Sequence, residues 1–353
     1  MIKLNRKRTN TITVGDLGIG GNSPVSIQSM TNTDTRDVSK TLDQIFELQE
    51  MGCQLIRVAV PDQDAALAIK KIKPHIKIPL VADIHFDYRL AIRAVEMGAD
   101  KLRINPGNIG DFSRVAAIAK VCREYSVPIR IGVNGGSLEK KWLDRYGGPT
   151  AEALVESTMD SIKRLEDIHF KDLVISIKSS NLPVMVRAYR LISDKIPYPL
   201  HIGVTEAGTP EMGTVKSAVG IGALLLDGIG DTLRVSLTGP PQREITVGKQ
   251  ILTAIGLIKN QVQIISCPTC GRCQIDLVYL AQEIEKAVSH IHKPLKVAVM
   301  GCAVNGPGEA KEADLGIAGG KNAALLFKKG KVIKKLKEDE IIQALLDEIT
   351  KEL

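Results

Sequence analysis

The strongest constraint on the fold is a regular alternation of short β-branched runs and longer amphipathic stretches between residues 24 and 258. In the amphipathic stretches apolar residues recur at helical spacing, for example at Val38, Leu42 and Ile45. The eight runs cover residues 24–30, 54–60, 79–85, 101–107, 128–134, 172–178, 199–205 and 232–238. Eight strand–helix units predict an α/β fold, a (β/α)8 TIM barrel. A doubly wound open sheet is the alternative, but no G-x-G-x-x-G motif follows the first run to support it.

Glycines mark the expected boundaries of several elements. Met51-Gly52 and Met97-Gly98 each follow a helical pattern and precede a strand, so they predict helix C-caps. The glycines of segment 18–21 lie before the first barrel strand. This segment predicts a small N-terminal hairpin that closes the bottom of the barrel.

The length of 353 residues leaves room for a second domain after the barrel. We expect a substrate-binding TIM barrel over residues 1–258 and a small α/β domain over residues 259–353. The expected elements of the small domain are strands at 262–265, 296–300 and 315–317, a hairpin over 324–333, and helices at 277–291 and 338–353.

The composition is that of a globular protein, with 44% hydrophobic and 25% charged residues. No apolar run approaches the roughly 20 residues that span a bilayer, and no apolar segment follows the basic N-terminus as in a secretory signal. We therefore expect a cytoplasmic protein without membrane contact. The net charge of +7 invites a nucleic-acid or anionic ligand, but aromatic residues make up only 3% and argue against single-strand nucleic-acid binding.

Four of the six cysteines lie between residues 267 and 302. Cys267, Cys270 and Cys273 form a C-x2-C-x2-C run, and Cys302 follows a predicted strand, so the fold can bring it to the same point. A disulfide framework is a poor interpretation for a long chain that is expected in the cytoplasm. Thiolates at this spacing indicate an iron–sulfur cluster or a zinc site, and the spacing alone leaves the two open. Inert core thiols are the alternative.

Polar side chains gather late in the predicted barrel strands, where barrel enzymes place their active sites. The candidates are Arg57, Asp83, His85, Arg103, Asn105, Arg130, Asn134, Ser176, Lys178, Arg234 and Ser236. A cation in an apolar run is unfavourable unless an anion lies nearby, so cations from five strands predict a pocket for a multiply charged anion such as a diphosphate. Pairing with barrel carboxylates is the alternative. Asp83, His85 and Glu206, which is expected to end a strand, are acid–base candidates.

Several longer motifs occur together and in order. They are V-A-D-I-H-F (81–86), R-I-N-P-G (103–107), G-V-T-E-A-G (203–208), C-P-T-C (267–270) and G-C-A-V-N-G-P-G-E (301–309). With these motifs the chain resembles the bacterial 4-hydroxy-3-methylbut-2-enyl diphosphate synthase family from about residue 5 to residue 320. The resemblance implies a TIM barrel followed by a small domain with one [4Fe–4S] cluster. The cluster ligands that it implies are Cys267, Cys270, Cys302 and Glu309, whereas Cys273 is an addition to the family pattern.

The same resemblance implies an oxidoreductase that opens the ring of 2-C-methyl-D-erythritol 2,4-cyclodiphosphate and removes water, in isoprenoid precursor biosynthesis. Two electrons are expected from a flavodoxin or a ferredoxin, and a homodimer is expected. The implied substrate-binding residues are Arg57, Arg103, Asn105, Arg130, Asn134, Lys178, Arg234 and Ser236. Glu206 is the implied proton donor, and the residues implied to orient the substrate are Asp83, His85, Asn134 and Asn305.

Two other hypotheses come from the residues alone. One is a pterin- or sugar-phosphate-binding barrel with a merely structural metal. The other is a zinc-ribbon nucleic-acid binder that uses the basic charge. The colour and metal content of the purified protein distinguish both from the iron–sulfur hypothesis.

Overall fold

The computed structural model describes residues 5–288, 291–302, 313–321 and 323–352 of the chain. The chain divides into two compact units, Met1–Leu257 and Ile258–Leu353, and each is described by itself. In the described ranges no helix has both the length and the apolar character needed to cross a membrane.

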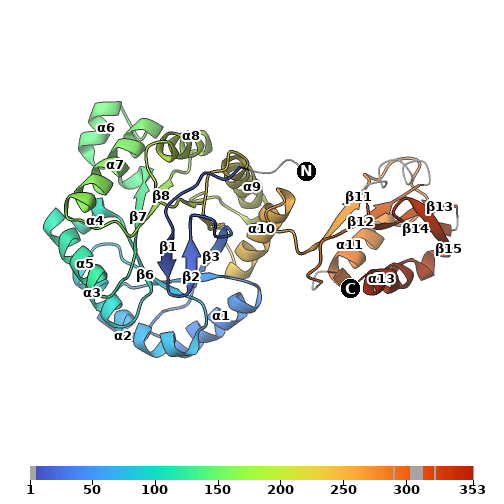
Figure 1. Cartoon of the computed structure of the whole chain (residues 1–353), viewed down its shortest axis with the longest axis horizontal. Coiled ribbons are helices and arrows are strands. Elements are labelled where there is room, and N and C mark those ends of the chain that lie inside the picture. Colours follow the sequence, from blue (N-terminus) through green and yellow to red (C-terminus); the bar gives the residue numbers. More distant parts are fainter. Residues whose placement is uncertain (1–4, 289–290, 303–312, 322, 353) are drawn as a thin grey trace. The chain divides into compact units, whose positions relative to one another are not determined.

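The first unit is a barrel of eight parallel strands with helices around it (Figure 1). The sheet order is β8-β7-β6-β5-β4-β3-β10-β9, and a parallel bridge between Ile175 and Leu200 joins its two ends. The strands are β3 (Ser26–Met30), β4 (Leu55–Ala59), β5 (Leu80–Asp83), β6 (Lys101–Ile104), β7 (Ile129–Asn134), β8 (Leu173–Lys178), β9 (His201–Ile202) and β10 (Thr232–Leu233). The helices are α1 (Val38–Glu50), α2 (Gln63–Ile72), α3 (Tyr88–Glu96), α4 (Pro106–Ile109), α5 (Phe112–Glu124), α6 (Lys140–Tyr146), α7 (Ala151–Asp167), α8 (Leu182–Ser193), α9 (Pro210–Leu226) and α10 (Pro241–Ala254). The (β/α)8 prediction is therefore confirmed.

The last two barrel strands are shorter than the sequence predicts. β9 and β10 contain two residues each, although the runs 199–205 and 232–238 predict longer strands. Beyond them the Arg234 N–H still donates to the Ile202 carbonyl at 3.0 Å. At this point the two segments lie so close that a side chain on Gly203 would clash with the Arg234 carbonyl. The expectation that Glu206 ends a strand is wrong, because it lies in the following loop with a φ of +52°.

Helix ends follow the sequence signals. Helices α1, α2 and α3 each begin after an aspartate whose side chain accepts a hydrogen bond from a backbone N–H of the first turn. Met51 and Met97 are the C-cap residues of α1 and α3, and the following Gly52 and Gly98 have φ values of +92° and +100°. Glycine adopts this conformation without the strain that a side chain adds. The two predicted C-caps are confirmed.

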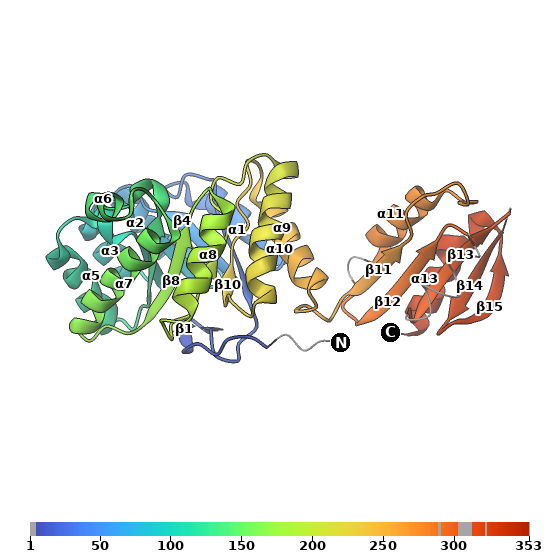
Figure 2. The ribbon, with the colours of Figure 1, turned by 90° about the horizontal axis from the view of Figure 1, so that it is seen from above.

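An antiparallel hairpin of β1 (Ile12–Val14) and β2 (Leu17–Ile19) covers the N-terminal end of the barrel (Figure 2). Its buried side chains form one apolar cluster with side chains from the starts of three barrel strands. The cluster contains Ile12, Val14, Ile19, Leu55, Val81 and Val174. The predicted hairpin at the bottom of the barrel is therefore confirmed.

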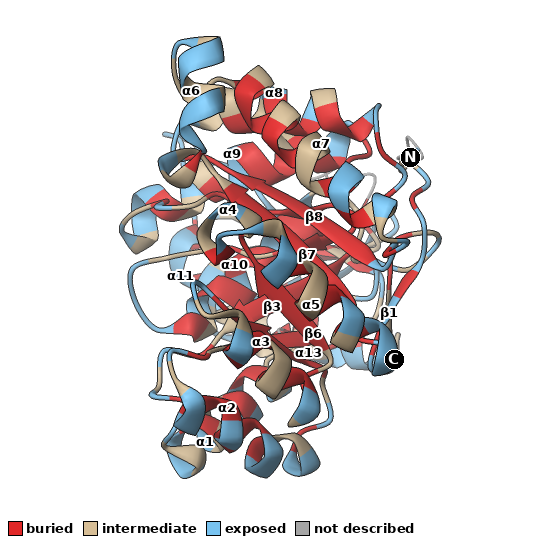
Figure 3. Ribbon diagram, turned by 90° about the vertical axis from the view of Figure 1, so that its left-hand side faces the viewer, coloured by how far each residue is buried: buried red, intermediate tan, exposed pale blue. Residues whose placement is uncertain are grey.

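The register of the strands sets the depth of each inward side chain, because four side chains from alternate strands form one layer inside such a barrel. The arginine layer contains Arg57, Arg103, Ser176 and Arg234. Below it lies the middle layer of Gln28, Val81, Arg130 and His201, and below that the floor layer of Leu55, Lys101, Val174 and Thr232, next to the hairpin. Figure 3 shows the strands buried along their length. Polar residues thus occupy positions that branched apolar residues fill in most such barrels.

The second unit is a five-stranded sheet in the order β11-β12-β13-β14-β15 with two helices packed on it. The first three strands are parallel, and the last two continue as an antiparallel hairpin. The strands are β11 (Val262–Ser266), β12 (Leu295–Met300), β13 (Leu315–Gly320), β14 (Ala323–Lys328) and β15 (Lys331–Leu336). The helices are α11 (Leu277–Val288) and α13 (Ile341–Lys351), which follows a 3-10 turn over Glu338–Glu340. Each predicted element of this unit has a counterpart here, with ends that differ by a few residues.

Candidate active site

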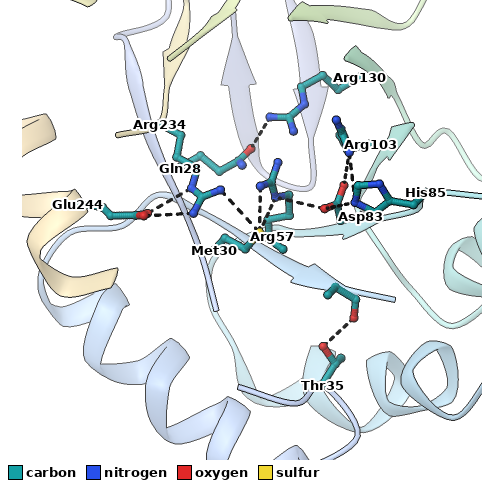
Figure 4. Close-up of polar contacts among 11 residues, drawn as sticks. Gln28, Met30, Thr35, Arg57, Asp83, His85, Arg103, Arg130, Arg234 and Glu244 are labelled. Atoms are coloured by element: carbon teal, nitrogen blue, oxygen red, sulfur yellow. Dashed lines mark hydrogen bonds and ion pairs between the residues drawn. The ribbon is translucent and has the colours of Figure 1, made fainter. Parts of the chain in front are cut away.

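Six cationic side chains occupy inward positions of the barrel (Figure 4 shows four of them). They are Arg57, Lys101, Arg103, Arg130, Lys178 and Arg234. Five of the six are buried, and Arg234 is nearly so, with 14% of its side chain exposed. The sequence predicts five of these positions, and the structure brings them together in one interior.

Asp83 is the carboxylate among these cations. Its Oδ1 accepts a hydrogen bond from Arg103 Nη1 at 3.1 Å, and its Oδ2 lies 3.3 Å from His85 Nε2 and 3.9 Å from Arg57 Nε. Burial by itself raises the pKa of Asp83, but Arg57, His85 and Arg103 outweigh it and hold that pKa well below its ordinary value. Asp83 is therefore ionised at neutral pH, which suits a residue that orients its neighbours better than a proton donor.

Glu244 of α10 holds Arg234 in place. Arg234 Nη2 and Nε donate to the two carboxylate oxygens at 3.1 and 3.2 Å. The same carboxylate accepts from the Leu237 N–H at 3.2 Å and from the Ser29 hydroxyl at 3.3 Å. A two-point contact of this kind fixes the plane of a guanidinium. Glu244 was not among the residues predicted from the sequence, because it lies on a helix.

A methionine sulfur lies between two of the guanidinium groups. Arg57 Nε and Nη2 lie 3.0 and 2.9 Å from Met30 Sδ, and Arg234 Nη1 lies 3.7 Å from it (Figure 4). Thioether sulfur is a weak acceptor, so these contacts leave the positive charge uncompensated. Burial lowers the pKa of Arg57 to about 9 although Asp83 opposes the shift, and Arg57 stays charged at neutral pH.

Arg130 and Lys178 have no ion-pair partner within the described part of the chain. Arg130 is fully buried, its Nη1 donates to Gln28 Oε1 at 3.4 Å, and its Nε has no partner there. Burial and then the charge of Arg57 lower the pKa of Arg130 and of Lys178. Both groups lack the anion that would stabilise their charged forms.

The barrel interior therefore carries an excess of positive charge. Among its described residues six basic side chains face two carboxylates, Asp83 and Glu244, an excess of four basic groups over acids. Burying unpaired charge is strongly unfavourable. The proposed alternative, that each cation pairs with a barrel carboxylate, applies to Arg103 and Arg234 and, at 3.9 Å from Asp83, to Arg57, but it fails for Arg130 and Lys178 among the described residues. The interior fits a multiply charged anion.

The remaining predicted residues surround this interior. Asn105 is buried, its Nδ2 donates to Ser137 Oγ at 2.9 Å, and its Oδ1 accepts from the Gly107 N–H at 3.2 Å. Asn134 is partly buried at the end of β7, and Ser236 is partly buried three residues beyond β10; Asn134 Oδ1 has no partner in the described chain. By contrast, His85 and Glu206 are exposed. The latter two are accessible to a ligand and to solvent.

In the second unit the cysteine segments meet at the ends of two neighbouring strands. Cys267 follows β11, and its Sγ accepts the Gly301 N–H at 3.2 Å just beyond β12. A side chain on Gly301 would lie 2.5 Å from Cys273 Sγ, so this sulfur also packs against the segment that leads to Cys302. Cys302 is buried, Cys267 and Cys273 are partly buried, and Cys270 is exposed. An N–H directed at sulfur stabilises a thiolate, the form that binds metal.

Two predicted residues of this region, Asn305 and Glu309, lie outside the described residues. In the part that is described, no three His, Cys, Asp or Glu side chains are grouped closely enough to hold a metal ion. The donor chemistry nevertheless fits a cluster, since several thiols lie in turns next to two parallel strand ends.

The sequence matches family models over nearly its whole length. Residues 9–249 match the GcpE TIM-barrel domain, and residues 263–351 match the GcpE protein C-terminal domain. The chain belongs to the GcpE family. A relative from Caldanaerobacter subterraneus subsp. tengcongensis is 61% identical over 99% of both chains. Another, from Clostridium perfringens, is 59% identical over 97% of this chain and 98% of the relative. Both are named 4-hydroxy-3-methylbut-2-en-1-yl diphosphate synthase (flavodoxin).

Solved structures show the same kind of fold at low sequence identity. Dihydropteroate synthase from Yersinia pestis with a sulfonamide drug aligns with a TM-score of 0.51, 10% identity, and coverage of 70% of this chain and 99% of that one. The enzyme from Xanthomonas albilineans with 7,8-dihydropteroate aligns with a TM-score of 0.50 and 15% identity, over 69% of this chain and 96% of that one. At such identity the likeness concerns the fold alone.

Some functional candidates were missed in the sequence. Lys101 lies two residues before Arg103 and so shares its face of β6, a signal that the alternation of strand side chains already contains. His201 and Gln28 lie inside the barrel in the same way. Met30 and Glu244 carried no local signal, because only the closed barrel brings them to the arginines.

Proposed function

We propose that this chain converts 2-C-methyl-D-erythritol 2,4-cyclodiphosphate into 4-hydroxy-3-methylbut-2-enyl diphosphate, in isoprenoid precursor biosynthesis. The reaction opens the ring at a carbon–oxygen bond to phosphate, consumes two electrons, takes up protons and releases one water. The observation that carries the proposal is the uncompensated positive charge inside the barrel, because the substrate is a diphosphate. Family membership supports the identity of the reaction.

Diphosphate binding is assigned to the cations of the barrel. Arg57, Arg103 and Arg234 are at one depth, and Arg130 lies below them. Asp83 and Glu244 fix two of these guanidinium groups in position before a ligand arrives, so little side-chain freedom is lost on binding. Lys178 adds a further cation, and the polar groups assigned to the rest of the substrate are Asn105, Asn134, Ser236 and Asn305.

Proton donation is assigned to Glu206. This residue is exposed in the loop after β9, at the end of the barrel where the strands finish. His85 is a second exposed residue, and its Nε2 lies beside one oxygen of Asp83 while the other oxygen accepts from Arg103. Because Asp83 stays ionised, we assign to it and to His85 the orientation of the substrate.

One [4Fe–4S] cluster is proposed for the second unit, held by Cys267, Cys270, Cys302 and Glu309. When bound, the cluster supplies single electrons and an iron site that polarises a substrate oxygen. The turn that contains Cys267 and Cys270 and the segment after β12 are the parts of this chain that would hold it. A carboxylate is a weaker ligand of iron than a thiolate, so Glu309 is the ligand expected to give way.

A flavodoxin is the proposed electron donor, since the relatives carry that donor in their names, and a ferredoxin is the alternative. We also propose a homodimer, which sedimentation of the intact protein tests. The proposal includes neither nucleic acid nor a membrane as partner.

Anaerobic purification followed by an assay tests the function. We expect a brown protein with about four irons per chain that consumes the cyclic diphosphate when reduced flavodoxin is supplied. A colourless zinc protein without turnover would contradict the proposal. A Glu309→Ala variant is expected to lose iron readily and Cys273→Ser to retain it, and the reverse result would make Cys273 the fourth ligand.

A further inference from the structure

The floor layer of the barrel contains a lysine that none of the assigned roles uses. Lys101 is fully buried on the same face of β6 as Arg103 and lies two layers below it, with the middle layer between them. Its Nζ has no hydrogen-bond partner in the described residues. The neighbouring Asp100 is engaged elsewhere, with Lys73 at 2.7 Å and with the Leu80 N–H at 2.7 Å. Within the described residues, the buried amino group of Lys101 therefore has no counter-charge.

The groups around Lys101 are cationic or neutral. The charged groups that face it are Arg130 of β7 and Arg57 of β4, and His201 of β9 titrates in the same interior. Burial first, and then Arg130 and Arg57, lower the pKa of Lys101 well below its ordinary value. Asp83 of β5 is committed to Arg103, Arg57 and His85. No described acid thus compensates Lys101.

Further polar atoms lie without a described partner at nearby inward positions. They are Ser26 Oγ, Gln28 Nε2, Ser176 Oγ, both ring nitrogens of His201 and Thr232 Oγ1. Thr232 pairs in register with Ser26 and with His201, so these three lie side by side on adjacent strands. An apolar floor would be more stable in the absence of ligand. The unfavourable burial of these polar groups is consistent with a bound ligand that compensates for it.

We propose that Lys101 is a positioning residue that determines specificity, an amino group below the arginine and middle layers that is charged when an anion is bound above it and that favours a diphosphate over a monophosphate without contacting either. The inference rests on the proposed diphosphate pocket. Attraction between charges grows with the charge of the ligand and extends through a low-dielectric interior. A charge beneath Arg130 therefore adds more to the binding of a diphosphate than to that of a phosphate.

Calorimetric binding of inorganic pyrophosphate and inorganic phosphate to the full chain tests the inference. For Lys101→Met we expect about tenfold weaker pyrophosphate binding and about threefold weaker phosphate binding. Lys101→Gln should behave alike, and Lys101→Arg should restore the preference for pyrophosphate. The ligand-free Lys101→Met protein should unfold at the same or a higher temperature. Lys120→Met removes a charge from an exposed position on α5 and is the matched control.

An unchanged ratio of the two affinities in folded Lys101→Met and Lys101→Gln would overturn the inference. Equal weakening of both ligands together with a lower unfolding temperature would also overturn it, because that result marks a structural residue. If the unsubstituted protein fails to bind pyrophosphate, the proposed pocket itself is wrong and this inference falls with it.

Discussion

Two groups of lysines, one in each unit, lie in opposite environments. In the barrel, Lys101 and Lys178 are buried among arginines. In the second unit, β15 is the edge of its sheet and presents Lys331, Lys334 and Lys335 to solvent. Lysine on an edge strand prevents unwanted strand pairing and adds little to stability. The net charge of +7 therefore does not by itself indicate a ligand, because its significance depends on where the charged side chains lie.

The cysteines of the two units show a similar contrast. In the barrel, burial raises the pKa of Cys53 to about 11 and that of Cys122 to about 12, so both thiols stay protonated. In the second unit, Cys270 is exposed and Cys267 accepts an N–H at its sulfur. Protonated buried thiols are inert, whereas accessible thiols can bind metal. The barrel thus buries two lysines and both of its cysteines, whereas the second unit exposes the lysines of β15 and one of its cysteines, Cys270.

The largest effect is expected from a thiol of the second unit. Cys302→Ser should abolish cluster assembly and turnover, because a serine oxygen is a poorer ligand for iron than a thiolate. Cys122→Ser in the barrel should leave the iron content unchanged. Iron per chain and visible absorption of anaerobically purified protein measure both. Equal iron in the two variants would break the contrast between the thiols.

A smaller but still large effect is expected from Arg130, whose buried guanidinium has no ion-pair partner among the described residues. Arg130→Met should weaken pyrophosphate binding about a hundredfold, since charge-assisted contacts are lost in a buried site. Arg89→Met is the control, because Arg89 is exposed on α3 beside Asp87. Calorimetry on ligand-free protein gives both affinities. Similar losses in the two variants would mean that surface charge, and not the interior, attracts the anion.

Next in size is the pH dependence of stability. A cation whose pKa is lowered on folding binds fewer protons in the folded than in the unfolded state, so stability rises with pH until the ordinary value of 10.5 is reached. Relative to Lys101→Met, the ligand-free protein should gain up to about 1.4 kcal/mol per pH unit as the pH approaches that value from below. Denaturant unfolding at several pH values measures the difference, and parallel curves would contradict it.

The smallest effect is expected at the edge strand. Replacing Lys334 and Lys335 together by glutamine should change the free energy of unfolding by less than about 0.5 kcal/mol and leave pyrophosphate affinity unchanged. Thermal unfolding and calorimetry provide the two readouts. A marked loss of pyrophosphate binding would show that lysines outside the barrel take part, and would remove the distinction between the two regions.

Local patterns predicted most of the fold. Strand runs, helical spacing and the glycines after Met51 and Met97 act over a few residues, and the structure follows them. The lengths of β9 and β10 could not be predicted, because they depend on the close approach of Gly203 to the Arg234 carbonyl. That contact joins the segments that follow β9 and β10, and the sequence of neither segment by itself indicates it.

The candidate site divides in the same way. Arg57, Arg103 and Arg130 were predictable, since cations are rare in apolar runs and each stands in its own strand. Glu244 was not, because its partner Arg234 is met only after α10 packs on the barrel. Lys101 is an intermediate case: its face was predictable from Arg103, but its depth required the register of the whole ring.

The β1–β2 hairpin has a kinetic consequence. Because its apolar side chains pack on the starts of the barrel strands, they close that end of the interior to water and to ligands. We therefore expect substrate and product to enter and leave at the opposite end, where barrel enzymes place their active sites. Each turnover must empty the barrel before the next begins, so accumulating diphosphate product should slow the enzyme by competing with substrate for entry.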